Sequence, residues 1–516
     1  MSTESPRGPD GPAPDTSEEP ASTTQEDAGG LVRRRVGLVL GLALAVVVYL
    51  VLPDSLSGDG RRTAAVATLM AVWWMTEAIP IPATALVPLV LFPVLLTEAD
   101  ITSVAAPYAN EVIFLFMGGF MLAMAMQRWD LHRRIALSVV GSVGGSPVML
   151  IAGFMLATAF ITMWVSNTAT AVMMMPIALS VLTLVARLAD GKADPNFGTA
   201  LMLGVAYAAS IGSVSTIIGT PPNAFMVGFL ADNHGISIGF GQWMVVGVPL
   251  AVVFLVIAWL VLTFLVYPPR IKELPGGRDL VRGQLREMGP MSRGEWTVLV
   301  VFVLAALSWI TIPLLADTET VGGALPWLSS VDDAGIAMAV AVALFLIPVD
   351  ARNGVPALDW QTAAQLPWGV LLLFGGGLSL SAQFGDTGLS DWIGEQVGLL
   401  GGVPVWVLIL AVAALVLLLT ELTSNTATAS IFVPVMAGVA LGMGLDIMTL
   451  VVPVALAASL AFMLPVATPP NAIVFGTGYI RIGAMVKAGV WLNLIALALI
   501  LATMYSVALA AFGLSA

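Results

Sequence analysis

Long apolar runs separated by short connectors fill almost the whole of this 516-residue chain. Hydrophobic residues make up 58% of the sequence and charged residues only 10%, whereas soluble proteins average about 45–50% and about 25%. This composition excludes a soluble enzyme and a nucleic-acid-binding protein. Because one helical crossing of a bilayer takes about 20 apolar residues, the runs predict an all-α polytopic membrane protein that contacts the lipid bilayer and no nucleic acid.

The reactive residue types that many enzymes need are scarce in this sequence. It has no cysteine and only two histidines, His132 and His234. Disulfides, thiolate metal sites and cysteine nucleophiles are therefore excluded. No serine–histidine pair, pair of metal-binding acids or HExxH motif occurs within the apolar runs. The sequence predicts a protein that is not an enzyme and has no prosthetic group.

The basic residues predict how the chain is oriented in the membrane. Residues 1–30 hold seven acids and one base and are rich in proline, serine, threonine and glycine, so we expect a disordered acidic tail. Arg33, Arg34 and Arg35 follow this tail, and bases near the ends of spans stay on the cytoplasmic side. Later connectors alternately carry and lack bases, and only Arg61 and Arg62 remain on the outer side. We therefore expect a multi-pass protein of the cytoplasmic membrane, with a cytoplasmic N-terminus and the C-terminus outside.

The same charges divide the chain into two halves. Residues 31–268 are expected to form the first half and residues 296–516 the second. The loop 269–295 between them has charges of both signs, which is typical of an amphipathic cytoplasmic connector. The last apolar run, 489–513, is expected to form a terminal span.

Two apolar runs, 148–186 and 404–443, are about twice as long as one crossing and carry polar residues at their centres. The first begins and ends beside basic segments, and the second begins and ends beside segments without bases. Each run therefore enters and leaves on one side, either as a re-entrant hairpin or as two full crossings. The polar centres favour hairpins, because non-helical backbone at membrane depth must be buried in protein or line a cavity.

The centres of the two long runs carry the same six residues. Residues 166–171 and 424–429 both read Ser-Asn-Thr-Ala-Thr-Ala. We expect the first hairpin to open from the inside and the second from the outside, so that the two halves form an inverted repeat. Inverted repeats in membrane transporters place the binding site near the bilayer midplane, between the halves.

A second pair of matching motifs follows the hairpins. Residues 219–223 read Gly-Thr-Pro-Pro-Asn, within the apolar run 198–230, and residues 467–471 read Ala-Thr-Pro-Pro-Asn, within the run 447–479. Proline lacks an N–H group and disfavours a helical conformation in the residue before it. The sequence therefore predicts two broken helices, whose free N–H and C=O groups meet the two hairpin tips.

These groups suit a small anion together with cations. Serine, asparagine and threonine donate to anions and accept from cations, helix N-termini attract anions, and the carbonyls of broken helices bind sodium in other transporters. No lysine or arginine lies between residues 353 and 480, so a bound anion depends on these groups and on co-bound cations. Two equivalent tips suit a ligand with two similar anionic ends, such as a short dicarboxylate. The alternative is that the polar residues only join helices.

The paired tips, the paired Thr-Pro-Pro-Asn loops and residues 74–80, which read Trp-Met-Thr-Glu-Ala-Ile-Pro, resemble the divalent anion/sodium symporter family and its INDY-type dicarboxylate transporters. The resemblance covers about residues 36–513. It implies an elevator-type homodimer with a scaffold domain and a moving transport domain. It also implies a substrate site made by Ser166, Asn167, Thr168, Ser424, Asn425, Thr426, Thr220, Pro221, Thr468 and Pro469.

The family's two sodium sites each use one tip, a residue about five positions before its asparagine, and the carbonyl before Thr-Pro-Pro. Sodium is therefore the expected coupling ion. Gly219 and Ala467 are expected to act through their backbone. On this chain the resemblance implies a first site at Thr162, Ser166, Asn167 and Gly219, and a second at Thr420, Thr423, Asn425 and Ala467.

The resulting hypothesis is sodium-coupled symport of C4-dicarboxylates such as succinate, malate or fumarate. Sodium-independent dicarboxylate exchange and a preference for another divalent anion, such as citrate or sulfate, stay open. An anion channel is a further alternative, and its flux would not saturate. Glu421 beside the second tip is a candidate functional residue, because charge is costly inside a membrane. Its expected role is to add charge near a cation site, to carry a proton or to pair with hydroxyls at a scaffold contact.

Overall fold

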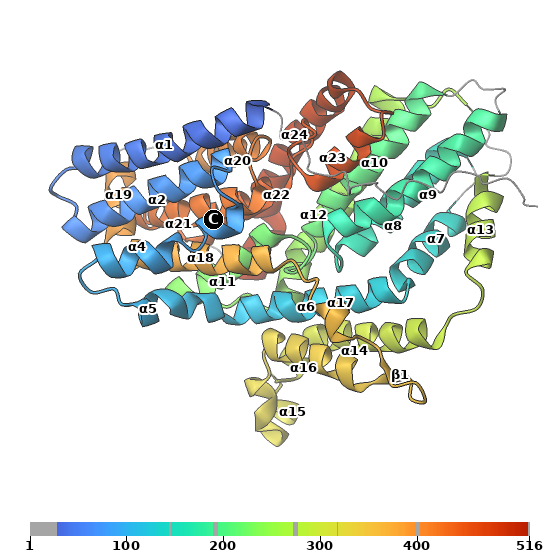
Figure 1. The fold of residues 1–516 in the computed structure, drawn as a ribbon, viewed down its shortest axis with the longest axis horizontal. Coiled ribbons are helices and arrows are strands. Elements are labelled where there is room, and N and C mark those ends of the chain that lie inside the picture. Colours follow the sequence, from blue (N-terminus) through green and yellow to red (C-terminus); the bar gives the residue numbers. More distant parts are fainter. Residues whose placement is uncertain are drawn as a thin grey trace, which may run out of the picture.

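The computed structural model describes residues 28–143, 146–188, 194–271, 277–316, 318–398 and 403–513. Its regular structure is almost entirely helical (Figure 1). The predicted all-α fold is confirmed, apart from a two-stranded antiparallel ribbon of β1 (Pro348–Asp350) and β2 (Val355–Pro356). The Asp350 carboxylate closes the turn of this ribbon, because it accepts from the N–H groups of Arg352 and Asn353.

The first part of the chain forms helices α1 to α7. Most of the predicted acidic tail, residues 1–30, lies outside the described residues, since α1 begins at Ala28. The elements are α1 (Ala28–Val51), α2 (Gly58–Thr76), α3 (Ile81–Thr84), α4 (Val87–Leu95), α5 (Ile101–Ala105), the 3-10 turn η1 (Ala106–Ala109), α6 (Glu111–Arg128) and α7 (Leu131–Ser142).

The next elements contain a helical hairpin, α8–α9, and a broken helix, α10–α11. In both cases the helix is interrupted at the polar motif. The bounds are α8 (Pro147–Thr162), α9 (Asn167–Leu188), α10 (Pro195–Ser213), α11 (Pro221–His234), α12 (Phe240–Leu260) with the π-helical turn η2 (Val261–Val266), and α13 (Gly277–Glu287) within the connector.

The remaining elements contain a second hairpin, α20–α21, and a second broken helix, α22–α23. Their bounds are α14 (Arg293–Ala316), α15 (Glu319–Ala324), the 3-10 turn η3 (Pro326–Ser330), α16 (Asp333–Leu346), α17 (Trp360–Ala363), α18 (Trp368–Asp386), α19 (Leu389–Gly398), α20 (Val405–Thr420), α21 (Asn425–Gly442), α22 (Met448–Ser459), α23 (Pro469–Gly476), α24 (Ile482–Thr503), the π-helical turn η4 (Met504–Ala508) and α25 (Leu509–Phe512).

Seven helical segments within the described ranges are long and apolar enough to cross a bilayer. The expected polytopic membrane architecture is therefore confirmed. The first arm of each hairpin, α8 or α20, has only 16 residues, which span about 24 Å at 1.5 Å per residue, less than a hydrocarbon core of about 30 Å. This length favours re-entrant arms over full crossings.

Matching glycines let helices approach closely in both halves. A Cβ atom on Gly118 of α6 would lie 2.5 Å from the carbonyl oxygen of Ala337 in α16. A Cβ atom on Gly376 of α18 would lie 2.3 Å from the carbonyl oxygen of Ala85, after α3. Larger residues at these two positions would push the helix pairs apart, so both glycines are required by backbone packing.

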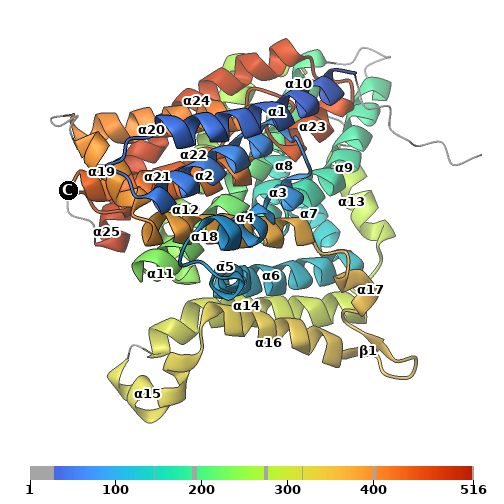
Figure 2. The same cartoon turned by 60° about the vertical axis from the view of Figure 1, so that its left-hand side comes forward.

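The two hairpins and the two broken helices interlock (Figures 1 and 2). Within each half, the first arm of the hairpin packs on the first part of the broken helix, α8 on α10 and α20 on α22. Between the halves, the second arm packs on the last part of the opposite broken helix, α9 on α23 and α21 on α11. This arrangement brings both interruptions of both halves into the interior.

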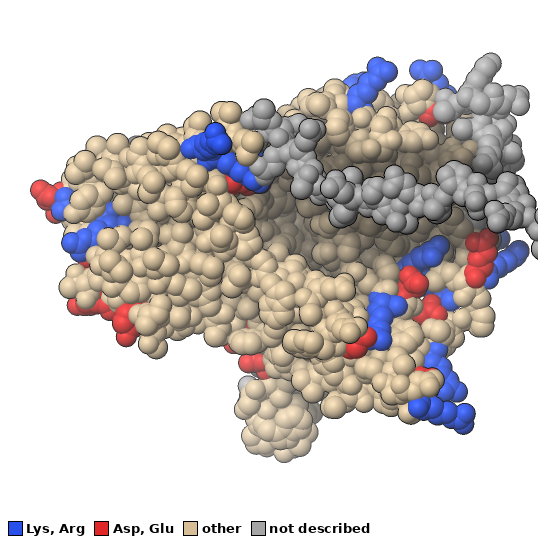
Figure 3. All heavy atoms as spheres, viewed as in Figure 1, with Lys and Arg blue, Asp and Glu red and all other residues tan. Residues whose placement is uncertain are grey.

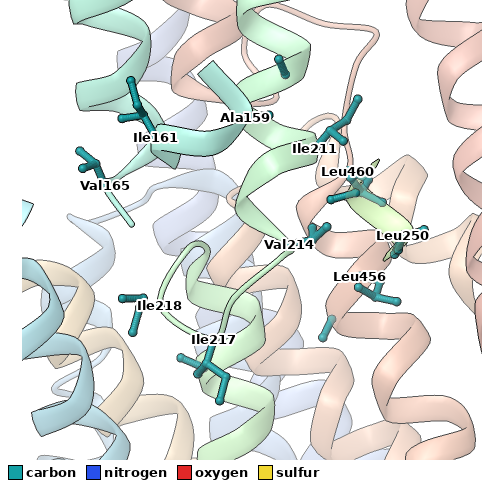
Figure 4. Close-up of a cluster of buried hydrophobic side chains, with 14 of the residues drawn as sticks. Ala159, Ile161, Val165, Ile211, Val214, Ile217, Ile218, Leu250, Leu456 and Leu460 are labelled. Carbon is teal, nitrogen blue, oxygen red and sulfur yellow. The ribbon is translucent and has the colours of Figure 1, made fainter. Parts of the chain in front are cut away.

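Apolar side chains from both halves fill the space around the first broken helix (Figure 4). Val214, at the end of α10, lies beside Leu250 of α12 and beside Leu456 and Leu460 of the second broken helix. All four side chains are buried, Leu250 at 4% exposure and the others at 0%. The polar groups of the interruptions are therefore held in a packed apolar surrounding, where unpaired polar atoms are costly.

Candidate functional site

The first hairpin tip is closed by a hydrogen bond between two predicted site residues. Thr162, the last residue of α8, donates from its hydroxyl to Asn167 Oδ1 at 2.8 Å. Asn167 is the first residue of α9, and the Ser166 hydroxyl accepts from the N–H of Ala169 at 3.4 Å. The tip therefore presents neutral oxygens beside a helix N-terminus, which attracts anions.

The second tip repeats this geometry. Thr420 at the end of α20 donates to Asn425 Oδ1 at 2.8 Å, and the same hydroxyl lies 2.9 Å from the carbonyl oxygen of Ala458. Thr420 and Thr162 are both fully buried. The two halves thus share the threonine–asparagine hydrogen bond as well as the hexapeptide. This is what we expect if the two tips have equivalent roles in binding.

The asparagine of each Thr-Pro-Pro-Asn motif holds the interrupted backbone that precedes it. Asn223 Nδ2 donates to the carbonyl oxygens of Val214 at 3.2 Å and Thr216 at 3.0 Å. Asn471 Nδ2 donates to the carbonyl oxygens of residues 461 and 464, at 3.3 and 3.0 Å. Both asparagines are fully buried. Sequence reasoning gave them no role, although their position in the repeated motif was a usable signal.

A direct hydrogen bond joins the two broken helices. The hydroxyls of Thr220 and Ser459 lie 3.2 Å apart, and both residues are buried. Ser459 ends α22. It was not predicted, although residues 454–459, Val-Ala-Leu-Ala-Ala-Ser, match residues 205–210, Val-Ala-Tyr-Ala-Ala-Ser. The predicted Thr468 instead caps its own helix, accepting from the N–H of Asn471 at 3.3 Å. Pro221 and Pro469 are the first residues of α11 and α23.

Two residues of the expected first sodium site, Asn167 and Gly219, lie beside Ser213, and a third, Thr162, is bonded to Asn167. Asn167 Nδ2 lies 3.4 Å from the Ser213 hydroxyl, and Asn167 is bonded to Thr162. A Cβ atom on Gly219 would lie only 2.2 Å from the Ser213 carbonyl oxygen, so only glycine fits there. Ser213 is a contact residue that sequence reasoning missed.

The expected second sodium set is only partly assembled. Thr420 and Asn425 are bonded to each other, but the Thr423 hydroxyl lies 2.8 Å from the Thr428 hydroxyl and 2.8 Å from the carbonyl oxygen of Leu419. Within the described ranges, no hydrogen bond joins Thr423 to Asn425. Ala467 is buried near the end of the second interruption, with its N–H bonded to the carbonyl oxygen of Leu464.

The two tips differ in exposure and are not bonded to each other within the described part of the chain. Thr168 is exposed, whereas the corresponding Thr426 is only 8% exposed. Ser166, Asn167, Ser424 and Asn425 are half-buried. The six tip residues are therefore less symmetric than the hexapeptide suggests, with the first tip more open than the second.

A family model described as the sodium:sulfate symporter transmembrane region matches residues 33–511. The chain belongs to this symporter family. Family membership confirms the predicted resemblance and identifies the protein as a membrane transporter rather than an enzyme.

Two curated relatives match this chain over most of their length and most of its own. A protein named sodium-dependent dicarboxylate transporter SdcS, from Staphylococcus saprophyticus, is 43% identical over 492 residues, covering 94% of this chain and 93% of the relative. An SdcS from Staphylococcus aureus is 41% identical over 480 residues, covering 92% of this chain and 91% of its own. The similarity therefore extends over nearly the whole of each protein and is not limited to one segment.

Two solved structures share the fold. The YdaH transporter of Alcanivorax borkumensis aligns with a TM-score of 0.58 and 18% identity, covering 87% of this chain and 98% of its own. Neisseria gonorrhoeae MtrF, described as illuminating a class of antimetabolite efflux pumps, aligns with a TM-score of 0.57 and 12% identity, covering 94% and 96%. At these identities the likeness establishes the fold alone.

The Glu421 carboxylate binds the interrupted backbone of the second broken helix, a role that the sequence did not predict. Its carboxylate accepts from the backbone N–H groups of residues 462, 463 and 464, at 2.8 to 3.1 Å, and from Asn493 Nδ2 at 2.7 Å. The side chain is 3% exposed. The expected pairing with hydroxyls is wrong, because the interrupted backbone of the second broken helix offers stronger, oriented donors. Glu421 therefore holds this interruption.

A second acidic group joins two helices far from the tips. Asp333, the first residue of α16, accepts from the N–H of Phe240, the first residue of α12, at 2.6 Å. The pKa of Asp333 is raised from 3.8 to about 6, chiefly by burial; the N–H of Phe240 lowers it, and the nearby charges of Asp332 and Glu111 also raise it. The ionised carboxylate is thus disfavoured in the folded protein.

The raised pKa of Asp333 predicts a pH-dependent stability. Between about pH 4 and pH 6 the folded state binds a proton that the unfolded state releases, so the contribution of Asp333 to stability falls as the pH rises through this window. Asp333→Asn keeps an acceptor for Phe240 and removes the charge. We expect its melting temperature to exceed that of wild type at pH 7.5 and to differ less between pH 5 and pH 7.5. The exposed acid Asp391 on α19 provides the control, and equal pH dependence in Asp333→Asn, Asp391→Asn and wild type would contradict the assignment.

Proposed function

We propose that this protein is a sodium-coupled symporter of C4-dicarboxylates such as succinate, malate and fumarate. The observation that carries the proposal is the threonine–asparagine pair at 2.8 Å in both hairpin tips, each at the start of a helix. The SdcS relatives are named sodium-dependent dicarboxylate transporters, which supports the same substrate class and coupling ion.

The charge balance of the site explains why sodium and substrate bind together. Four helices, α9, α11, α21 and α23, begin at the two tips and the two Thr-Pro-Pro motifs, and their N-termini carry partial positive charge. No lysine or arginine lies between residues 353 and 480. Helix termini carry only partial charges, so no lysine or arginine of this segment balances a buried dianion with a full positive charge. Sodium ions held by the neutral oxygens of the tips supply the missing charge.

We further propose that the hairpins and broken helices move as one transport domain against a scaffold, within a homodimer. The interlocked packing of α9 on α23 and of α21 on α11 supports this idea, because the second arm of each hairpin is joined to the opposite half. The outer surface of α14 exposes large apolar side chains, including Trp296, Val300 and Leu304, which suit a lipid or protein neighbour.

We also propose a cytoplasmic N-terminus and an external C-terminus. Lys and Arg side chains lie mainly over the right-hand part of the molecule, where α7 and α13 are found, with one group in the upper middle beside α1 and a smaller group at the left-hand end (Figure 3). Because the chain has no cysteine, single introduced cysteines can be labelled without background. In intact cells an impermeant maleimide should label Ser55→Cys, in the exposed loop after α1, and spare Glu287→Cys on α13. The reverse pattern would invert the topology.

Uptake into proteoliposomes tests the function. Labelled succinate should accumulate when an inward sodium gradient is imposed and should not accumulate when choline replaces sodium. Unlabelled malate and fumarate should compete, and uptake should saturate, unlike flux through a channel. Equal uptake in choline would favour sodium-independent exchange. Stronger competition by sulfate or citrate would identify another preferred dianion, and the description of the matched family makes sulfate the first to compare.

The proposed sodium sites predict a selective effect of two substitutions. Thr162→Val and Thr420→Val keep the side-chain shape and delete one oxygen beside Asn167 or Asn425. A lost polar contact worth about 1–3 kcal/mol corresponds to a rise of roughly five-fold to more than a hundred-fold in the sodium concentration for half-maximal uptake. Succinate dependence in excess sodium should change less.

The control for this prediction is Thr158→Val on the same helix α8. Thr158 is equally buried, but its hydroxyl is bonded to the Phe154 carbonyl oxygen one turn before and not to a tip residue. Its sodium dependence should match wild type. If Thr162→Val and Thr420→Val also matched wild type, the two sodium sites would have to be placed elsewhere.

A further inference from the structure

A cavity of about 520 Å³ lies where the segments 182–199 and 267 of the first half contact the segment 478–484 of the second half. Its walls come from the end of α9, the start of α10 and the end of η2 in the first half, and from the start of α24 in the second. We call it the basal cavity; its polar lining includes Asp194, Asn196, Thr199, Tyr267, Tyr479 and Arg481.

The basal cavity is separate from the proposed transport site. Leu182 in its wall and Asn167 at the first tip both lie on α9. At 1.5 Å per residue the helix places them about 22 Å apart. A ligand in the cavity therefore lies far from the first tip, and no residue of the second tip lines the cavity.

Some polar groups of the basal cavity are already committed to structure. The Asp194 carboxylate accepts from the N–H groups of Asn196, Phe197, Arg270 and Ile271, at 2.5 to 3.4 Å. Asn196 Nδ2 donates to the Pro268 carbonyl oxygen at 2.9 Å. The Tyr267 hydroxyl donates to the Ala484 carbonyl oxygen at 2.9 Å. These groups fix the walls and leave the Asp194 charge directed into backbone amides.

Other polar groups of the cavity remain free to bind a ligand. Among the described residues, the Arg481 guanidinium and the hydroxyls of Thr199 and Tyr479 have no hydrogen-bond or ion-pair partner. All three are donors, and arginine with hydroxyl neighbours is a typical oxyanion-binding set.

The basic residues around the basal cavity also favour an anionic ligand. Arg481 and Lys487 are the only lysine or arginine residues after Arg352 in the sequence. Arg481 lines the cavity, and the Lys487 ammonium group lies 5.6 Å from the ring centre of Tyr267, another lining residue. Both basic residues of this long segment are therefore placed at one cavity rather than spread over the surface.

We propose that the basal cavity binds a phosphate oxyanion through Arg481, Thr199 and Tyr479, with Lys487 adding positive charge. An anionic phospholipid headgroup and free inorganic phosphate are two sources of this chemistry. Basic pockets between transmembrane helices bind anionic headgroups, and tyrosine and arginine are typical of the membrane interface. Apolar neighbours, Leu182 and Val185 in the wall and the exposed Ile482 beside Arg481, offer contacts for an acyl chain.

The first experiment compares wild type with Arg481→Gln in nanodiscs of phosphatidylcholine, with or without phosphatidylglycerol. Native mass spectrometry after release counts the phosphatidylglycerol that each protein retains. We expect wild type to retain it and Arg481→Gln to bind it at least five-fold more weakly, with Tyr479→Phe in between. Arg352→Gln, which removes an exposed base from the turn between β1 and β2, should behave like wild type.

A second experiment uses inorganic phosphate in phosphatidylcholine nanodiscs, against chloride at equal ionic strength. A rise in melting temperature that depends on Arg481 would support the site and identify a soluble anion as a ligand. Retained phosphatidylglycerol without a phosphate effect would support the site with lipid as its ligand. The proposal is overturned if neither ligand discriminates Arg481→Gln from Arg352→Gln. Equal melting temperatures of all variants in phosphatidylcholine alone establish that folding is unchanged.

Discussion

Asn167→Ala is expected to abolish transport while leaving the protein folded and in the membrane. The Asn167 amide links the end of α8 to the end of α10, through Thr162 at 2.8 Å and Ser213 at 3.4 Å. Truncation removes these contacts and the amide that the substrate is expected to meet. The residue is half-buried, so the change empties no packed core and should cost little stability. Succinate uptake should fall at least a hundred-fold, which corresponds to about 2.8 kcal/mol.

Asn425→Ala provides the matching test in the second half. Asn425 has the same partner geometry, with the Thr420 hydroxyl at 2.8 Å, and the same loss of uptake is expected. Asn233→Ala is the control, because Asn233 near the end of α11 is also half-buried and bonds only to the Phe229 carbonyl oxygen. Near wild-type uptake by either tip variant, with its normal melting temperature, would show that the substrate site does not lie between the tips.

The local geometry of the site could be predicted from the sequence because short motifs encode it. Each hairpin turns where Ser-Asn-Thr interrupts an apolar run, and each broken helix restarts at the first proline of Thr-Pro-Pro-Asn. Proline cannot continue a helix from the preceding residues, so these positions are fixed by covalent geometry. Thr162–Asn167 and Thr420–Asn425 are pairs five residues apart, which a tight turn brings together.

The long-range partners could not be predicted, because no local rule specifies them. Thr220 and Ser459 are 239 residues apart, and their contact depends on how the two halves pack. Ser213 lies within an α10 that is buried on every side, where neither periodicity nor polarity singles it out. The resemblance predicts Thr423 beside Asn425, but the Thr423 hydroxyl lies 2.8 Å from the Thr428 hydroxyl instead. Sequence motifs therefore located the tips and the helix interruptions but not their long-range partners.

Glu421→Ala is expected to have the largest effect on stability among buried substitutions near the site. It removes the common acceptor of three backbone N–H groups and of Asn493 Nδ2. Each buried donor left without an acceptor costs about 1–3 kcal/mol, a large share of the total for a protein stable by about 5–15 kcal/mol. We expect a clearly lower melting temperature and no succinate uptake, because the released segment continues to Ala467 and Thr468.

Glu421→Gln separates the charge from the shape. The glutamine carbonyl oxygen can still accept from two N–H groups, but its NH₂ group replaces the other acceptor and faces a further donor. We expect a smaller loss of melting temperature than for Glu421→Ala, with residual uptake that needs several-fold more sodium. Glu395→Ala, at an exposed acid on α19, should leave both properties unchanged. An unchanged melting temperature for Glu421→Ala would show that the carboxylate does not stabilise residues 462–464. A loss of uptake by this variant would then need another cause.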